Sequence, residues 1–185
     1  MKLKITKDNI VYWSQKYDEC YDPKDKHNEE RIKDLLIGQR YLTQKNLWDI
    51  MDWKAPRIRN YANNNTPSMI RRITRFSFET ENKRRRIESL LGQKGGLRGV
   101  GWPVASTILH FAFPDKYPIM DFRVIRSLLG IEPPLAYKFE LWESYCERIR
   151  HISKKLSISI RTVEKALWKF DKEHNLRFNK FECCD

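Results

Sequence analysis

Residues 95–130 read GGLRGVGWPVASTILHFAFPDKYPIMDFRVIRSLLG and carry the clearest structural signal in the chain. Four of the seven glycines fall at positions 95, 96, 99 and 101, so the backbone can turn sharply over residues 97–102. Pro103 suits the first turn of a helix, where its missing N–H would have no partner. The apolar residues that follow keep a helical period up to Pro114: Val104, Ala105, Ile108, Leu109 and Ala112. These features predict two helices joined by a tight turn, a hairpin over residues 82–113.

Helical periodicity extends over the rest of the chain. Further helices are expected near residues 10–21, 25–40, 43–54 and 67–79, and two long amphipathic helices are expected after residue 130. Thr43, Thr66 and Ser159 have the side chains that cap helix starts. No repeat, linker or strand pair is evident. We expect an all-α fold in a single domain, 1–185, with N-terminal helices over 7–80, the hairpin region over 82–130 and C-terminal helices over 135–174.

The composition favours a polyanionic partner. The 185 residues include 36 Lys and Arg against 24 Asp and Glu, a formal charge of +12, and 41% of them are hydrophobic, enough for a folded core. No stretch approaches the roughly 18 apolar residues of a membrane span, and the N-terminal MKLKI lacks the core of a signal peptide. We expect a cytoplasmic protein, nucleoid-associated in a bacterium, that contacts no membrane. Seven cations between Arg71 and Arg86 precede the hairpin and make nucleic acid the first candidate partner.

The glycine turn has the features of a phosphate site. Its glycines leave backbone N–H groups uncovered between two helices, and such a group closed by a helix N-terminus suits an anion. A tight helix–helix turn without any ligand has the same local sequence. The glycines alone therefore do not decide between these two interpretations.

The pattern around the turn resembles the helix-hairpin-helix base-excision DNA glycosylases, the endonuclease III-like superfamily. The hairpin of that family reads L-x-G-[VI]-G-x-x-x-A, which Leu97, Gly99, Val100, Gly101 and Ala105 match. Its catalytic aspartate lies in a V-D-x-x-V-x-R-like segment, and Asp121 takes that place 22 positions after Gly99. The resemblance covers residues 87–130. It implies a cofactor-free enzyme on duplex DNA, with Asp121 as catalytic residue and with backbone contacts from Leu97, Arg98, Gly99, Val100, Gly101 and Arg123.

Two departures from the family pattern limit the activity that the resemblance implies. Family members with lyase activity carry a lysine two residues after the second hairpin glycine, where this chain has Pro103. Proline has no amine that can form a Schiff base with the sugar. The four-cysteine cluster loop of endonuclease III is also absent. The resemblance therefore implies a minimal, cluster-free and monofunctional member without lyase activity.

The chemistry of base excision gives Asp121 a role that does not depend on the family name. Breaking an N-glycosidic bond builds positive charge on the sugar, and a fixed carboxylate stabilises that charge or activates the attacking water. Asp121 precedes the apolar run 122–129, so we expect it at a helix N-terminus, where the helix dipole favours an anion. The competing interpretation is that Asp121 only caps that helix.

A flipped base also needs a pocket with aromatic and hydrogen-bonding groups. The candidates are Trp53, Arg57 and Trp13, although aromatic residues at helical spacing more often belong to a core. The cysteines at 20, 146, 183 and 184 form no CxxC pair, and the histidines lie on separate elements, so no metal site is expected.

Three functions remain open at this point. The leading one is a monofunctional DNA glycosylase that hydrolyses the glycosidic bond of a damaged or modified base flipped from duplex DNA. The second is a helix-hairpin-helix protein that binds the DNA backbone without chemistry. The third is a structural helical protein whose charge serves another acidic partner.

Overall fold

Helices make up the regular structure of the protein. The computed structural model describes residues 3–133 and 136–175, and within these ranges there is no β-strand, only an isolated bridge between Leu91 and Leu97. In chain order the elements are α1 (Lys7–Glu19), α2 (Pro23–Leu36), α3 (Gln44–Lys54), the 3₁₀ helix η1 (Pro56–Asn64), α4 (Pro67–Glu79), α5 (Lys83–Glu88), the 3₁₀ helix η2 (Gly92–Lys94), α6 (Trp102–Ala112), α7 (Phe122–Leu129), α8 (Phe139–Leu156) and α9 (Ile160–His174). The predicted all-α class is confirmed.

Local capping explains where several helices begin. Thr43, Thr66 and Ser159 each accept a hydrogen bond from the backbone N–H three residues further on, as predicted. Asp22 caps α2, and Pro23 occupies its first position. These side chains satisfy N–H donors that a helix start leaves without an intrahelical acceptor.

Two helix ends differ from the prediction. The helix expected to reach residue 40 ends at Leu36, and Gly38 follows with φ +78, which takes the chain out of the helix. The first helix of the hairpin expected over residues 82–113 ends already at Glu88, and Leu90 and Leu91 lie beyond it with fully buried side chains. In both places the chain turns earlier than the apolar period indicated.

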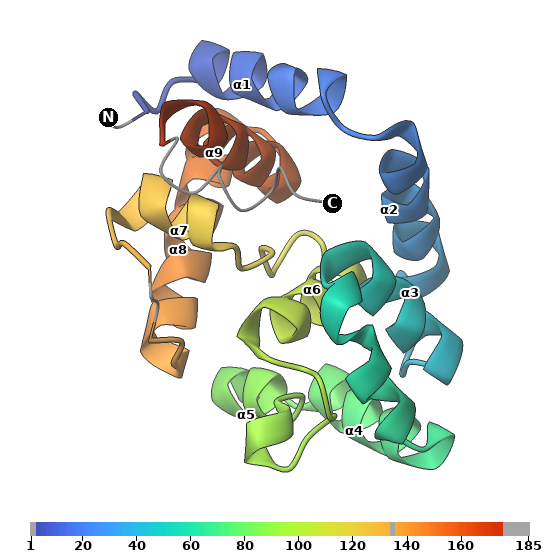
Figure 1. Ribbon diagram of the computed structural model, residues 1–185. Helices are drawn as coiled ribbons and strands as arrows, with labels where there is room; N and C mark the ends of the chain where they lie inside the picture. Colours follow the sequence, from blue (N-terminus) through green and yellow to red (C-terminus); the bar gives the residue numbers. More distant parts are fainter. Residues whose placement is uncertain (1–2, 134–135, 176–185) are drawn as a thin grey trace.

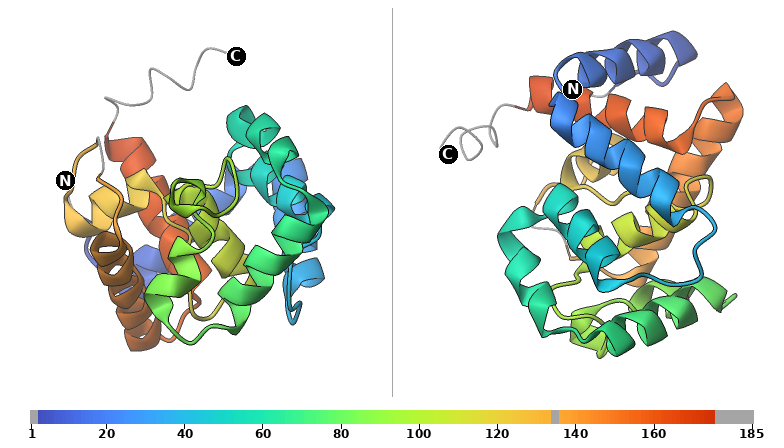
Figure 2. Two further views of the ribbon diagram at one scale, coloured as in Figure 1. Left: turned by 90° about the horizontal axis from the view of Figure 1, so that it is seen from below. Right: turned by 90° about the vertical axis from the view of Figure 1, so that its right-hand side faces the viewer.

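Two groups of helices flank α6. On one side α1 lies along α9, which also packs against α7 and α8 (Figure 1). On the other side α2 and α3 pack against α6, while α4 and α5 lie together at one end of the molecule (Figure 2). The chain between α6 and α7 connects the two groups, so residues at the start of α7 lie where the groups meet.

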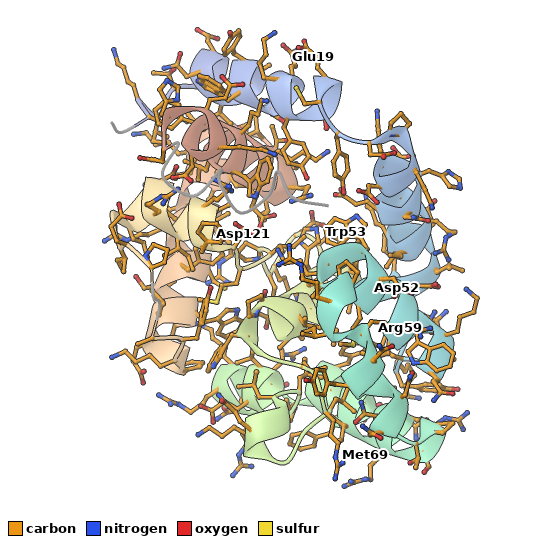
Figure 3. The ribbon with its side chains drawn as sticks, viewed as in Figure 1. Glu19, Asp52, Trp53, Arg59, Met69 and Asp121 are labelled. Atoms are coloured by element: carbon orange, nitrogen blue, oxygen red, sulfur yellow. The ribbon has the colours of Figure 1, made fainter. Side chains whose placement is uncertain are left out.

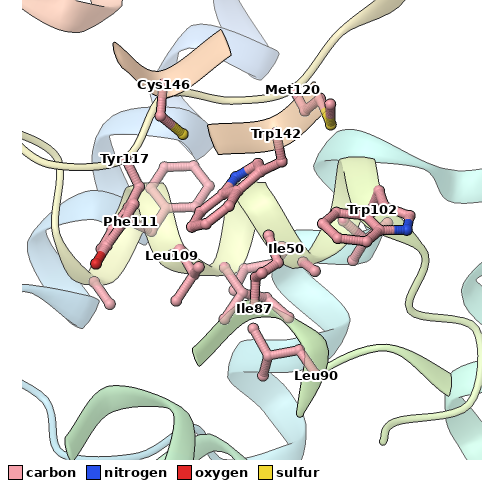
Figure 4. Close-up of a cluster of buried hydrophobic side chains, with 14 of the residues drawn as sticks. Ile50, Ile87, Leu90, Trp102, Leu109, Phe111, Tyr117, Met120, Trp142 and Cys146 are labelled. Atoms are coloured by element: carbon pink, nitrogen blue, oxygen red, sulfur yellow. The ribbon is translucent and has the colours of Figure 1, made fainter. Parts of the chain in front are cut away.

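The core is built around α6. Ten of its eleven residues are buried, as expected of a helix that neighbours surround on every side. Figure 4 shows Leu109 and Phe111 of this helix among side chains from other elements, including Ile50 of α3 and Trp142 of α8. Because α6 is fixed on all sides, the loop at its N-terminus starts from a rigid position.

Candidate nucleic-acid loop and carboxylate site

The glycine loop, residues 92–101, joins α5 and α6 and is closed by its own backbone. The Gly92 N–H donates to the Val100 carbonyl oxygen at 2.9 Å, which brings the two ends of the loop together. At Gly96 a Cβ would lie 2.4 Å from the carbonyl oxygen of Ser89, so no larger residue fits. Gly99 has φ +79, and a Cβ there would lie 2.9 Å from the Cβ of Tyr61. The loop conformation therefore depends on glycine at both positions.

Asn65, which follows η1, holds the loop in place through its side-chain amide. Its Oδ1 accepts from the Arg98 N–H at 2.8 Å, and its Nδ2 donates to the Arg98 carbonyl oxygen at 3.0 Å. Nδ2 also donates to the carbonyl oxygen of Ala62 at 3.1 Å. Asn65 is 1% exposed, whereas the side chain of Arg98 faces solvent. The amide thus fixes the backbone of Arg98 and leaves its guanidinium free to meet a ligand.

Two N–H groups of the loop remain open to a ligand. Within residues 3–133 and 136–175, the Gly99 and Gly101 N–H groups make no backbone hydrogen bond. Both glycines line an open hollow of about 440 Å³, together with Tyr61 and Arg98. A Cβ on Gly101 would meet nothing closer than Pro103 Cδ at 4.0 Å, and its φ of −97 suits any residue. Packing within the protein does not explain glycine at 101, but close approach of an anion to its N–H would.

Asp121 is both a helix cap and one half of an ion pair. Its Oδ1 accepts from the Arg123 N–H at 3.0 Å, so it caps α7. Its Oδ2 accepts from the Lys54 Nζ at 3.0 Å, and the side chains of Lys54 and Asp121 are 15% and 20% exposed. Figure 3 shows Asp121 at the start of α7, on the side where Trp53 lies at the end of α3. The capping role is therefore real, and the lysine is a second partner that capping does not require.

The segment in front of Asp121 is held from two sides. The Met120 N–H donates to Ser106 Oγ of α6 at 2.8 Å, and the Tyr145 hydroxyl of α8 donates to the Ile119 carbonyl oxygen at 2.6 Å. Tyr145 and Ser106 are fully buried. The position of Asp121 is therefore set by α6 and α8 as well as by its own helix.

Titratable groups surround this carboxylate. Burial, together with the negative charge of Asp121, raises the pKa of Tyr137 to about 12. Glu164 of α9, which is 1% exposed, has its Oε1 3.3 Å from the Tyr145 hydroxyl oxygen, and its burial raises its pKa to about 8. The positive charge of Arg161, whose Nη1 lies 4.0 Å from Glu164 Oε2, acts against that rise, and the charge of Lys54 does so to a smaller extent. The junction of the two helix groups is thus polar and charged rather than apolar.

Helix α3 connects the glycine loop to the carboxylate. The side chain of Met51 lies against Gly99, where a Cβ would be 3.2 Å from Met51 Cε. Lys54 follows three residues later on α3 and reaches Asp121. Three residues correspond to an axial rise of about 4.5 Å. The loop and the carboxylate therefore meet the same helix less than one turn apart.

The structure brings only part of the expected base pocket to this region. The Trp53 Nε1 donates to the Tyr21 hydroxyl at 2.7 Å, and its ring lies edge-on to Phe111 with centroids 5.4 Å apart. Arg57 is exposed in η1. Trp13 lies elsewhere, because its ring packs against Phe170 and His174 of α9. Trp53 therefore stays near the carboxylate, whereas Trp13 belongs to the interface between α1 and α9.

Arg123, expected on the DNA backbone, lies in the core. It is 1% exposed, its Nη1 is 3.5 Å from Asp171 Oδ2, and its guanidinium stacks on Phe122 and Trp168. A buried guanidinium that already faces a carboxylate cannot reach a phosphate in this conformation. The physical reason is the packing of α7 against α9, which buries the four consecutive residues 123–126 and places the buried Asp171 opposite the Arg123 guanidinium.

Sequence reasoning missed two residues of this region. Lys54 lies 67 positions before Asp121, and Asn65 lies 33 positions before Arg98. No local pattern marks either pairing, although Lys54 stands within the segment 53–57 that Trp53 and Arg57 had made a candidate. Among the described residues, no group of three or more His, Cys, Asp or Glu is placed to hold a metal, and no helix is long and apolar enough to cross a membrane. Cys183 and Cys184 lie outside those residues.

Comparison of the chain with protein-family models, curated proteins and solved structures found no match.

Proposed function

We propose that this protein is a DNA N-glycosylase without lyase activity, which binds duplex DNA through a helix-hairpin-helix formed by α5, the glycine loop and α6. The observation that carries the proposal is that the glycine loop and Asp121 both contact helix α3. The glycine loop, with open N–H groups, and the ion-paired carboxylate of Asp121 meet that helix within one turn. In this proposal a phosphate at the loop holds the duplex so that a sugar of the bound strand faces Asp121.

The two hydrogen bonds to Asp121 hold its carboxylate in one orientation. The Arg123 N–H and the Lys54 ammonium each occupy one oxygen, while a carboxylate has about four acceptor positions in all. The remaining lone pairs can face a sugar or a water molecule. In the proposed step the C1′–N bond breaks with its electron pair leaving on the base, which takes up a proton from solvent, and the proton that Asp121 receives afterwards returns to solvent. Water adds to C1′ and gives its proton to Asp121, whose charge also stabilises the positive sugar.

Two residues support the proposed absence of lyase activity. Pro103 has no amine, and Lys54 donates to Asp121 as an ammonium, which has no lone pair to attack C1′. The product would then be an intact strand with an abasic site.

The alternative function is a DNA-binding protein without chemistry. One observation favours it: both oxygens of Asp121 already have partners inside the protein. In that case the carboxylate stabilises the junction of α3 and α7, and the glycine loop alone contacts the backbone.

An excision screen separates the two functions. Duplexes that carry uracil, 8-oxoguanine, alkylated purines or hypermodified cytosines are incubated with the protein, and abasic sites are detected by alkaline strand cleavage. The glycosylase proposal predicts excision of at least one base, with strand breaks only after alkali. Tight duplex binding without excision from any substrate of the panel supports the alternative.

Binding itself is tested by its dependence on salt. We expect little sequence preference and a log–log slope of roughly −4 to −5, because about four to six phosphates would be contacted. An affinity that stays constant between low and moderate salt contradicts both functions.

A further inference from the structure

The structure divides the seven cations between Arg71 and Arg86 into two sets with different surroundings. On α5 most of the charge is neutralised within the protein. Lys83 lies 3.5 Å from Glu143, and Arg84 lies 2.6 Å from Glu140. Arg86 donates to the carbonyl oxygens of Phe78 and Thr80 and stacks on Phe113. These side chains tie α5 to α8 and to the end of α4, which is a structural role.

The three arginines of α4 have no such partners. Arg71, Arg72 and Arg75 are exposed, and no carboxylate in the described part of the chain lies within ion-pair distance of them. Arg71 and Arg75 instead stack on the ring of Tyr41, with distances of 4.8 and 5.2 Å to its centroid. The nearby Glu79 is paired with Arg40 at 2.6 Å and does not neutralise them.

These residues line one continuous surface, which we call the α4 face: Pro67, Ser68, Arg71, Arg72, Arg75, Phe76 and Glu79 around an open hollow of about 590 Å³. Phe76 is 48% exposed there. Like charges four residues apart destabilise a helix, so an unpaired cluster of this kind costs stability in the free protein. A polyanion bound to the α4 face would remove that repulsion.

The α4 face begins next to the glycine loop. Asn65, whose amide holds the backbone of Arg98, is separated from Pro67 by Thr66 alone. From Ser68 to Arg75 the helix rises about 10 Å. One DNA strand carries a charge about every 3.4 Å along the axis, so this length matches about three phosphates.

We propose that the α4 face is a second phosphate-binding surface, which holds the backbone of the duplex that flanks the segment bound by the glycine loop. The inference rests on the proposed binding of duplex DNA, but it does not depend on catalysis. Tyr41 orients Arg71 and Arg75 for this contact, and the paired cations of α5 contribute less.

The test compares two variants that lose the same charge. The first is Arg71→Gln/Arg72→Gln/Arg75→Gln. The control is Arg148→Gln/Lys154→Gln/Lys155→Gln, which removes three exposed cations of α8 that have no ion pair in the described residues. Binding to a fluorescent 25-base-pair duplex is followed by anisotropy from about 0.05 to 0.5 M salt, and thermal unfolding confirms that both variants fold.

The α4 variant is expected to lower the magnitude of the log–log salt slope by about 2.7, or 0.9 for each of three phosphates. If the affinities of the wild type and the α4 variant converge near 1 M salt, the affinity of the variant at 0.1 M salt is up to about 500-fold lower than that of the wild type. The control changes the slope by less than about 1. Tyr41→Leu should also weaken binding at unchanged net charge, whereas Tyr41→Phe, which keeps the ring, should not.

Three results would overturn the inference. If the wild type binds with a steep slope and the two triple variants lose affinity equally, only net charge matters and the α4 face is not a site, while the proposed function stands. If the α4 variant binds as the wild type does, the DNA does not reach this helix. If the wild type shows no salt-dependent binding to duplex DNA, the proposed function and the α4 surface fail together.

Discussion

Replacing Asp121 by Asn tests the carboxylate at the centre of the proposed function. Asn can keep the cap, because its Oδ1 can accept from the Arg123 N–H that Asp121 now binds at 3.0 Å. Its Nδ2 then faces the Lys54 ammonium, which loses the carboxylate oxygen it now reaches at 3.0 Å. Both side chains are four-fifths buried or more, so screening by solvent is limited. A lost hydrogen bond between charged groups of this kind costs about 2 kcal/mol of unfolding free energy.

Two measurements follow from this change. The melting temperature should fall by about 4–8 °C, since about 2 kcal/mol corresponds to that shift in a chain of this size. Single-turnover excision of any accepted base should fall at least about a hundredfold, which is about 2.7 kcal/mol of lost transition-state stabilisation. Affinity for duplex DNA should hold or rise slightly, because an anion that faces the backbone is removed.

The double variant Lys54→Gln/Asp121→Asn separates folding from chemistry. A Gln carbonyl oxygen can accept from the Asn amide, so the double variant should recover most of the lost stability. It should not recover excision, since no carboxylate remains. Excision at the wild-type rate by the single or the double variant would refute the assignment of Asp121 as the catalytic residue.

Three further perturbations have defined outcomes. Gly101→Ala should leave the unfolding free energy unchanged within about 0.5 kcal/mol but weaken duplex binding in anisotropy titrations, and unchanged binding would argue against an anion at its N–H. Gly99→Ala should instead destabilise the fold, because Gly99 has φ +79 and a Cβ there would contact Tyr61. Borohydride should trap no protein–DNA cross-link, and a cross-link that Lys54→Gln abolishes would instead identify Lys54 as a nucleophile. Burial raises the pKa of Glu164 to about 8, so the folded state holds its proton where the unfolded state has lost it, and stability falls as pH rises between the two pKa values. Urea unfolding should therefore show the wild type losing about 2 kcal/mol or slightly more relative to Glu164→Gln between pH 5 and pH 7. A parallel pH dependence of the two proteins would contradict that protonation state.

The helical architecture was largely predictable because its signals are local. Thr43, Thr66 and Ser159 cap helices at the predicted positions, since a cap depends on a side chain and an N–H three residues away. The turn ahead of α6 also lies where the glycines indicated, and Pro103 is in the first turn of that helix. Helix ends were less predictable from the apolar period. The chain leaves α2 at Gly38, which has a positive φ, and it leaves α5 before Leu90 and Leu91, which are buried outside the helix.

The candidate site was predictable only in its local parts. Asp121 as a helix cap followed from the apolar run behind it. The burial of Arg123 could not be predicted, because the sequence does not show which side of α7 meets α9 and its buried Asp171. The same holds for Trp13, whose helical spacing favoured a core over a pocket without showing which helix it would meet, and which packs against α9.

The sequence by itself determined the all-α class, the helix starts and the glycine turn, because each depends on residues within about one helical turn of one another. Only the tertiary structure decided that Lys54 meets Asp121 and that Asn65 holds Arg98. It also separated the partnered cations of α5 from the unpaired arginines of α4. Charged side chains far apart in sequence find partners only through the packing of whole helices, and one-dimensional spacing does not contain that packing.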